Sequence, residues 1–297
     1  MRLRKLLNYK QGMIGYQLTL YKRVLAQKTF FSGFSPIFSN FLFFLVLLGE
    51  LCFPEAVFGA DIKNWRMHFQ DAVTPVMETI THFHSILMLI LFGVVAVVLI
   101  LLLFVIIRFN RKTNPIPSKT MHHTLLEIVW TLVPLVIVMA IVIPSIELIY
   151  FEDKAHDPAL TIKATGHQWY WTYSYPESKI EFDSRLIPDG DIDPSKGQKR
   201  LLSVDNAIYI PVNTVVRILT TSEDVIHSWA MPAFGVKKDS IPGKLNETWI
   251  KVTKEGIYHG QCSELCGMQH GFMPIEVRVV SKEVYQKWLD EAKKKFS

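Results

Sequence analysis

Two long apolar stretches dominate the first half of the chain and predict helices that cross a membrane. Ile86–Ile107 holds 22 residues without a charge, which is enough for a helix to span the hydrocarbon core of a bilayer. Ile128–Ile146 is a second apolar run, and its prolines are tolerated in a membrane helix when neighbours satisfy the freed backbone groups. We therefore predict a transmembrane hairpin within residues 61–150, with helices over about 82–108 and 125–150.

The loop between the two helices sets the expected orientation. It contains no acid, and its basic residues are Arg108, Arg111, Lys112 and Lys119. The positive-inside rule places such a loop on the cytoplasmic side of the membrane. Both flanking segments, and therefore both termini, are expected on the opposite side.

Beyond about residue 150 the pattern changes to short β-branched runs that predict strands. Several of them alternate apolar with polar residues, and Gly, Pro, Asn and Asp separate them, which is typical of an all-β sandwich or barrel. A helix over Lys282–Phe296, with a charged solvent face, is expected to close this extracytoplasmic domain, residues 151–297. The runs span residues 160–164, 207–212, 214–220, 248–252 and 275–280.

The start of the chain has the order of a targeting signal. The first 49 residues carry seven basic residues and no acid, and they contain the apolar stretch 41–49. The small pair Gly59–Ala60 follows, and the order charged, apolar, small is typical of a secretory signal. We predict that residues 1–60 form a signal segment that is removed; a mitochondrial-type presequence and an uncleaved helix are the alternatives.

Charge and cysteine content exclude two classes of protein. Lys plus Arg is 32 and Asp plus Glu is 27, so the formal net charge is +5. The surplus lies in the first 49 residues, because the remainder holds 25 basic and 27 acidic residues. A nucleic-acid-binding domain needs a positive balance, which is missing outside this segment. Three cysteines are too few for a disulfide scaffold.

Candidate metal ligands gather in one segment, residues 261–274. Cys262, Cys266, His270 and Met273 lie within twelve residues. Thiolate and thioether sulfur with imidazole favours copper, and a mononuclear blue-copper site needs only one cysteine. Two thiolates therefore favour a pair of bridged copper ions, which needs a second imidazole from elsewhere. A disulfide and a zinc site are the alternatives, and neither gives Met273 a role.

The second imidazole has several candidates. His227 is the preferred one, because it closes an apparent strand and lies beside Trp229, which can exclude water. Composition alone does not separate it from the other histidines of the domain, which are His156, His167 and His259.

A family resemblance now follows from these residues. Cys-Ser-Glu-Leu-Cys-Gly-x-x-His-x-x-Met-Pro is similar to the binuclear copper loop of cytochrome c oxidase subunit II. Segments 127–134, 166–171 and 222–229 resemble the same family in the same order, from about residue 75 to the end. The resemblance implies a cupredoxin-like Greek-key β-sandwich or barrel, anchored by the two-helix hairpin and followed by the C-terminal helix.

The resemblance also implies a role for each residue of the loop. Cys262 and Cys266 would bridge the two copper ions, and His227 and His270 would each cap one of them. Met273 would be a weak axial ligand. The backbone carbonyl of Glu264 would complete one copper, and its carboxylate would hold a magnesium ion against the large catalytic subunit.

The implied function is one-electron transfer within a respiratory enzyme. The subunit would accept electrons from cytochrome c at the copper A centre and pass them to haem in subunit I. There, oxygen is reduced to water, coupled to proton translocation. Asp205, Glu223 and Asp224 would help to dock the basic cytochrome c. Other oxidase subunits and the lipid bilayer are further partners, and haem belongs only to the partner subunit.

Two further residues gain roles from the resemblance. Trp169 would be the point at which electrons enter. Strict alternation instead places it with Trp171, Tyr173 and Tyr175 on one strand face, which is expected to be core. Glu127 is an acid near the cytoplasmic end of a predicted membrane helix, so it is a functional candidate. The resemblance implies that it lies at the mouth of a proton channel. Its alternative is interfacial snorkelling near the headgroups.

The expected location is the bacterial inner membrane, with the mitochondrial inner membrane as the alternative. The strongest rival function is a membrane-anchored copper chaperone or thiol oxidoreductase, which would have one span and an α/β domain. A quinol oxidase subunit would share the fold but lack the copper ligands. A purely structural assembly subunit would bind no copper.

Overall fold

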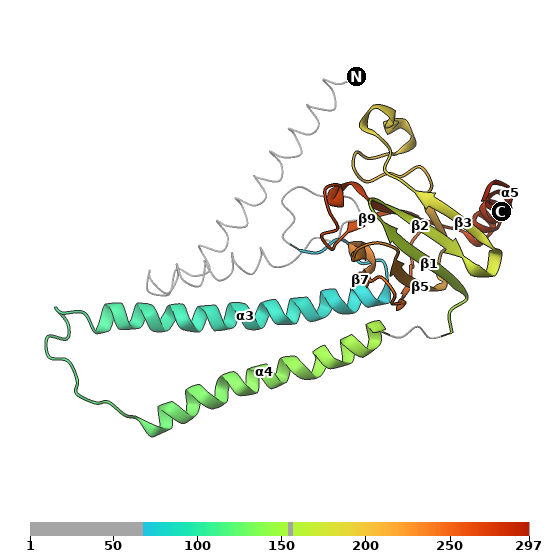
Figure 1. The fold of residues 1–297 in the computed structure, drawn as a ribbon. Coiled ribbons are helices and arrows are strands. Elements are labelled where there is room, and N and C mark those ends of the chain that lie inside the picture. Colours follow the sequence, from blue (N-terminus) through green and yellow to red (C-terminus); the bar gives the residue numbers. More distant parts are fainter. Residues whose placement is uncertain (1–67, 154–156, 297) are drawn as a thin grey trace, which may run out of the picture. The chain divides into compact units, whose positions relative to one another are not determined.

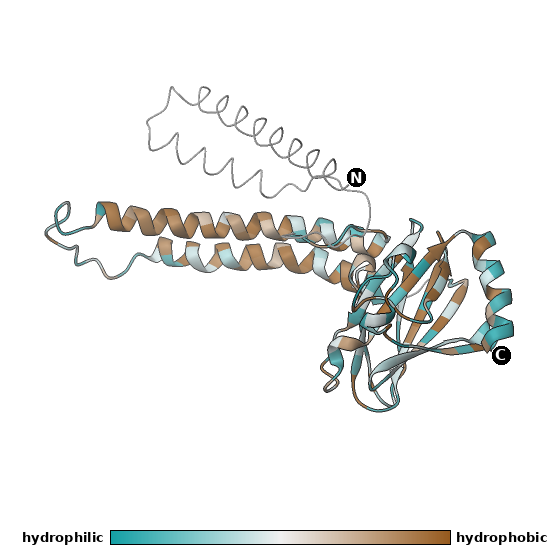
Figure 2. Cartoon of the chain, turned by 90° about the horizontal axis from the view of Figure 1, so that it is seen from above, coloured by the Kyte–Doolittle hydropathy of each residue, from teal (hydrophilic) through white to brown (hydrophobic). Residues whose placement is uncertain are grey.

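Two long helices open the part of the chain that the structure describes. The computed structural model describes residues 68–153 and 157–296, so the predicted signal segment lies outside these residues. Helices α3 (Pro75–Arg108) and α4 (Thr124–Asp153) run side by side in opposite directions (Figure 1). Apolar residues follow both of them almost continuously (Figure 2). Both are long and apolar enough to cross a membrane, so the predicted hairpin is confirmed.

The first membrane helix begins at Pro75 instead of about residue 82, because its start is capped. The Thr74 hydroxyl oxygen accepts the backbone N–H of Met77 at 3.1 Å, and Pro75 occupies the first helical turn. The same hydroxyl donates to the carbonyl of Phe234 at 2.7 Å. The first turn therefore packs on the β domain, a tertiary contact that the hydropathy pattern does not reveal.

The second half of the described chain forms two five-stranded sheets packed as a sandwich. Their strand orders are β3-β2-β1-β5-β8 and β4-β10-β9-β6-β7. The pairs β1–β5 and β4–β10 are parallel, and the other paired neighbours are antiparallel. The strands are β1 (Leu160–His167), β2 (Tyr170–Tyr175), β3 (Ile180–Ser184), β4 (Ile208–Pro211), β5 (Val215–Ser222), β6 (His227–Met231), β7 (Val236–Ser240), β8 (Asn246–Lys251), β9 (Gly256–Cys262) and β10 (Pro274–Val280).

The all-β prediction is confirmed, and the five predicted runs fall on β1, β4, β5, β8 and β10. The C-terminal helix is α5 (Lys282–Phe296), also as predicted. Strand β6 gave no alternating signal because all five of its residues are buried. The expectation that His227 closes a strand was wrong: β5 ends at Ser222, and His227 opens β6.

The β1–β2 hairpin resolves the conflict over Trp169. Trp171, Tyr173 and Tyr175 alternate along β2 and are fully buried in the core, as the pattern predicted. The chain turns at Gln168 and Trp169, between the end of β1 and the start of β2. Trp169 therefore lies outside the strand and is half-buried. The alternation that places the other three rings in the core does not apply to it.

Strands β6 and β9 approach so closely at Gly260 that a side chain has no room there. A Cβ atom at this position would collide with the carbonyl oxygen of Ala230 and lie 2.5 Å from Met231 Sδ. Strand β9 ends two residues later at Cys262, and β6 begins at His227. This glycine contact thus fixes the spacing of two strands that carry candidate ligands.

We expect Gly260→Ala to lower the free energy of unfolding by about 2–3 kcal/mol, because overpacking forces β6 and β9 apart. Gly190→Ala is the matched control, since a Cβ there meets nothing within 4 Å. Its effect should stay within about 0.5 kcal/mol. Urea unfolding of the protein in detergent measures both, and equal effects would show that the β6–β9 contact is not tight.

Candidate metal centre

Three segments meet at one end of the sandwich. They are the β1–β2 turn, the start of β6 and the loop that links β9 to β10. Trp229 of β6 pairs with Cys262 of β9, so the first residue of β6 lies next to the point where the loop leaves β9. The loop contains the short 3-10 helix His270–Phe272 and returns to the sheet at Pro274. Its ligand candidates are therefore held between strand ends.

The nitrogen and sulfur atoms of the predicted ligands form a continuous chain. Cys262 Sγ lies 3.9 Å from His227 Nδ1 and 3.9 Å from Cys266 Sγ. Cys266 Sγ in turn lies 3.6 Å from His270 Nδ1 and 3.5 Å from Met273 Sδ. All five side chains that were proposed from the sequence as ligands thus converge, and each cysteine sulfur has an imidazole of its own.

The cluster has the properties of a metal site. His227, Cys262 and Cys266 are buried, and their donor atoms lie within 4.8 Å of one another. The two cysteines are free, since their sulfur atoms are much farther apart than the ~2.05 Å of a disulfide. The carbonyl oxygen of Glu264 lies 3.3 Å from Cys262 Sγ, while its carboxylate is exposed. Sulfur with imidazole suits copper, and a nearby thioether argues against zinc.

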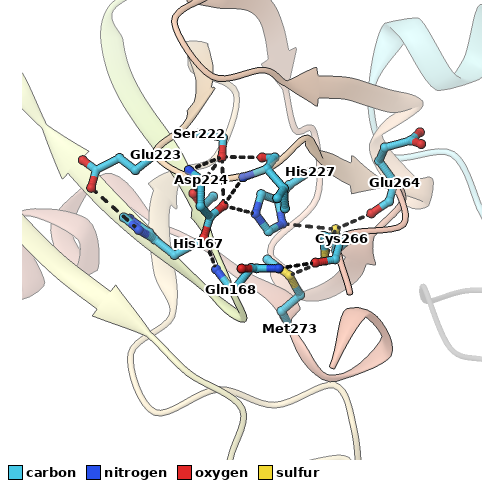
Figure 3. A network of polar contacts seen from close by, with 12 residues as sticks. His167, Gln168, Ser222, Glu223, Asp224, His227, Glu264, Cys266 and Met273 are labelled. Atoms are coloured by element: carbon cyan, nitrogen blue, oxygen red, sulfur yellow. Dashed lines mark hydrogen bonds and ion pairs between the residues drawn. The ribbon is translucent and has the colours of Figure 1, made fainter. Parts of the chain in front are cut away.

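A carboxylate holds the far side of the His227 ring. His227 Nε2 lies 2.8 Å from Asp224 Oδ1, and the backbone N–H groups of Gln168 and Val225 each donate to that carboxylate at 2.6 Å (Figure 3). The ring therefore presents Nδ1 to the sulfur atoms. A carboxylate behind a ligating imidazole is the usual arrangement in metal sites, because it fixes the ring and its tautomer.

Burial and hydrogen bonding shift the pKa values of the cluster. Burial lowers the pKa of His227, but hydrogen bonds to Cys262 and Asp224 raise it above its ordinary value overall. Burial raises the pKa of Cys262, but its bonds to His227 and to nearby backbone groups bring that pKa down to about 7. Burial and the neighbouring Cys262 raise the pKa of Cys266 to about 12. One thiolate forms readily, and a second needs the charge of a metal cation.

The β1–β2 turn lies directly against the metal loop. The side-chain amide of Gln168 donates to the carbonyl of Cys266 at 2.8 Å. A Cβ atom on Gly267 would lie 3.0 Å from Trp169 Cζ2, so the indole rests on the backbone of this glycine. Trp169 thus lies against the metal loop, and its role in electron entry stays a prediction.

Sequence reasoning missed the residues that support the ligands. A Cβ atom on Gly166 would lie 2.8 Å from His227 Cδ2, so this glycine makes room for the imidazole. Gln168 and Gly267 connect the turn to the loop, and Asp224 was expected only as a docking acid. The three-residue spacing of Asp224 and His227 after a strand was the one available signal, since a carboxylate there can reach back to the ring.

The other histidines of the domain do not reach the cysteine pair. His167 and His259 face carboxylates instead, at 3.9 Å from Glu223 and 3.8 Å from Glu276. His156 lies outside the described residues. Among the described candidates for the second imidazole, only the histidine that opens β6 contacts a cysteine.

The remaining predicted residues occupy separate places. The Glu223 side chain is 72% exposed, whereas that of Asp224 is 30% exposed and turned toward His227. Asp205 is exposed, and its carboxylate accepts the backbone N–H of Arg185 at 2.7 Å. Glu127 lies in the first turn of α4, where its carboxylate accepts a backbone N–H at 3.1 Å, and the structure does not bring it to the cluster.

Known proteins resemble both parts of the chain. The profile "Cytochrome C oxidase subunit II, periplasmic domain" matches residues 160–280, and "Cytochrome C oxidase subunit II, transmembrane domain" matches residues 62–148. A probable cytochrome c oxidase subunit 2 of Rickettsia bellii is 47% identical over 246 residues, which cover 82% of this chain and 91% of that protein. Subunit 2 of Zea mays is also 47% identical, over 76% of this chain and 89% of that protein.

A solved structure is similar as well. The crystal structure of the periplasmic domain of subunit II of cytochrome oxidase from Bradyrhizobium japonicum is 53% identical, with a TM-score of 0.45. It covers 48% of this chain and 100% of that chain. The sequence matches extend over the hairpin and the β domain in one order. This chain therefore belongs to the family of cytochrome c oxidase subunit II.

Proposed function

We propose that this subunit accepts electrons from cytochrome c at a binuclear copper A centre and passes them to haem in subunit I. The observation that carries the proposal is the pairing of donors. Two cysteine sulfur atoms lie 3.9 Å apart, and each has an imidazole nitrogen of its own within 3.9 Å. A single blue-copper ion would need one thiolate, whereas two copper ions bridged by two thiolates account for every donor.

The donor set fits the copper pair, which when bound supplies one-electron transfer without breaking a bond. Cys262 and Cys266 would bridge the ions, and His227 and His270 would cap opposite ends. Met273 and the Glu264 carbonyl would be the weak ligands. Strand ends and the Asp224 carboxylate hold these groups in place, so both oxidation states would share nearly one geometry.

The location follows from the charge of the inter-helix loop. Its basic residues favour the cytoplasmic side, which would place the copper domain in the periplasm of a bacterium, or in the intermembrane space if the protein is mitochondrial. The oxygen chemistry and the coupled proton translocation would belong to subunit I. Glu127, near the cytoplasmic end of α4, would lie at the mouth of a proton path in that partner.

The acids near the β1–β2 turn support docking of a basic cytochrome c. Glu223 projects into solvent beside His167, and Asp205 binds the backbone of Arg185, whose guanidinium lies 3.5 Å over the ring of Tyr170. Asp224 would add the negative charge of its carboxylate to the same face. Trp169 would take the electron there, next to the metal loop.

The exposed carboxylate of Glu264 would hold magnesium at the interface with subunit I. Its backbone carbonyl already lies at the cluster, so the side chain can point to a partner while the main chain serves the copper pair. Carboxylate oxygen is the ligand type that magnesium prefers.

A thiol oxidoreductase is the second candidate function, because two free thiols 3.9 Å apart could close a disulfide with little movement. The electron paramagnetic resonance spectrum of the oxidised oxidase complex separates the two functions. We expect the multi-line hyperfine pattern of one electron shared by two copper nuclei, and its loss in Cys266→Ser.

Met268→Leu is the matched control for that spectrum. This methionine lies in the same loop but is 83% exposed and far less able to serve as a ligand than the buried Met273. The control should keep the pattern unchanged. A wild-type complex without it, whose Cys262 and Cys266 form a disulfide, would favour the thiol oxidoreductase.

We expect Asp224→Asn to weaken copper binding by roughly 10–100-fold, because the amide no longer offers a charged acceptor to the His227 ring. Competition with a copper chelator measures the affinity. Glu223→Gln, which removes a neighbouring but exposed carboxylate, should leave the copper affinity unchanged. Equal losses in both variants would mean that general charge, and not the hydrogen bond to His227, is responsible.

The same Glu223→Gln variant should raise the KM for cytochrome c by about twofold at low salt, as expected for one exposed ion pair of ~0.5 kcal/mol. The effect should fade as salt screens the charge. Glu283→Gln on α5 removes another exposed acid, outside the proposed docking face, and should leave the KM unchanged. Steady-state oxidation of cytochrome c at several ionic strengths tests this, and a salt-independent change would argue against steering.

A further inference from the structure

We infer that Gly267 is a positioning residue for electron transfer, because its missing side chain lets the Trp169 indole touch the metal loop. The inference rests on the proposed function, in which Trp169 receives the electron from cytochrome c. Gly267 directly follows the ligand Cys266, so contact at this position is contact with the main chain that leads to a bridging sulfur.

The turn fills the space that a side chain at position 267 would need. A Cβ atom there would lie 3.0 Å from Trp169 Cζ2 and 3.2 Å from Trp169 Nε1. It would also lie 3.1 Å from Gln168 Nε2. Separations this short are repulsive, since carbon atoms pack best at about 3.5–4.0 Å. Even one methyl group at Gly267 would therefore have to move the indole or the loop.

The indole is held by packing alone. Trp169 Nε1 is buried and has no hydrogen-bond partner among the described residues. Three other tryptophans differ, because their indole N–H groups donate to oxygen atoms. Trp171 donates to Met273, Trp229 to Tyr173 and Trp249 to Phe151. Without such a bond, the place of the Trp169 ring depends on the surface against which it rests.

The rest of the turn cannot retreat to make room. The backbone N–H of Gln168 donates to Asp224, and its side-chain amide donates to the carbonyl of Cys266. Moving the turn as a whole would break the bonds that connect it to the support of His227 and to the loop. A side chain at Gly267 would therefore displace the indole and the end of the Gln168 side chain, while the backbone of the turn stays in place.

The redox step itself is simple. Reduced cytochrome c would lose one electron, the copper held by Cys262 and Cys266 would gain it when bound, and no covalent bond would change. Because the rate of electron tunnelling falls steeply with separation, the van der Waals contact of Trp169 with Gly267 shortens the gap that the electron crosses. Displacing the ring from the loop lengthens this gap and should therefore slow the step.

The test uses the purified oxidase complex with Gly267→Ala. We expect the first electron from reduced cytochrome c to arrive measurably more slowly, at most by several-fold, in stopped-flow measurements. Reduction by a small-molecule reductant, the copper spectrum and the affinity for cytochrome c should stay unchanged. The structure of the variant should show the indole moved from the loop. Wild-type transfer from cytochrome c would overturn the inference.

Gly271→Ala is the matched control, because it lies in the same loop beside His270 and a Cβ atom there meets nothing within 4 Å. It should transfer electrons at the wild-type rate. A slowing equal to that of Gly267→Ala would overturn the inference, because it would point to the loop and not to the indole contact.

Backbone strain needs a separate control, because Gly267 has φ of +125°, a conformation that disfavours any side chain. In a Trp169→Phe background, which lacks Cζ2 and Nε1, Gly267→Ala should cause no additional slowing. An additional slowing of the same size would overturn the inference. Gly267→Ala alone could also fail to bind copper. In that case, recovery of copper binding in the Trp169→Phe, Gly267→Ala double variant supports a collision with the indole. Failure of the double variant to bind copper overturns the inference.

Trp169→Phe by itself separates this inference from the proposed function. If that variant receives electrons from cytochrome c at the wild-type rate, Trp169 is not the acceptor, and the proposed function is wrong at this residue. If it is slow while Gly267→Ala is not, the role of Trp169 stands and only the role of Gly267 is refuted.

Discussion

The close pairing of β6 with β9 is the constraint on which the metal centre depends. These strands approach until the Gly260 main chain meets the carbonyl of Ala230, and this contact leaves Trp229 opposite Cys262. The start of one strand and the end of the other then lie together. A histidine and a cysteine 35 residues apart in sequence become neighbours within 3.9 Å. Rigid strands, and not a flexible loop, therefore set the first nitrogen–sulfur distance of the site.

A small polar network extends this rigidity to the loop. The Asp224 carboxylate binds the His227 ring and the backbone of Gln168, and the Gln168 amide binds the carbonyl of Cys266. One residue of the β1–β2 turn thus connects both halves of the site. Charged acceptors make such hydrogen bonds stronger than neutral ones, so the network can hold the loop although its outer surface is exposed. The aromatic ring of Trp169 is placed by the same turn.

The membrane helices are attached to this domain through specific contacts at their ends. The Thr74 hydroxyl donates to Phe234, and the indole of Trp249 donates to the carbonyl of Phe151 at 3.0 Å. An ion pair of 2.9 Å between Lys238 and Asp153 lies at the same end of α4. These contacts connect both helices of the hairpin to the strands β7 and β8 and the turn before them, so the β domain is joined to its anchor by more than the connecting chain.

The sequence alone determined the features that depend on local pattern. Charge-free apolar runs predict membrane helices because a helix satisfies its own backbone hydrogen bonds inside the bilayer. Short β-branched runs, several of them alternating, predicted half of the described strands. The ligand loop was recognisable because Cys262, Cys266, His270 and Met273 are close in sequence. Their chemistry favoured copper before any fold was known.

Only the tertiary structure decided which distant groups join that loop. Composition left His156, His167, His227 and His259 open, and the pairing of β6 with β9 brought His227 to the cysteines. Asp224 was expected to face a partner, but it turns inward to the histidine. Strand β6 gave no periodic signal because all of its residues are buried. The glycines at 166, 260 and 267 gave none because their role is to leave room for neighbouring atoms. Space between strands is a property of packing, and no local pattern of residues encodes it.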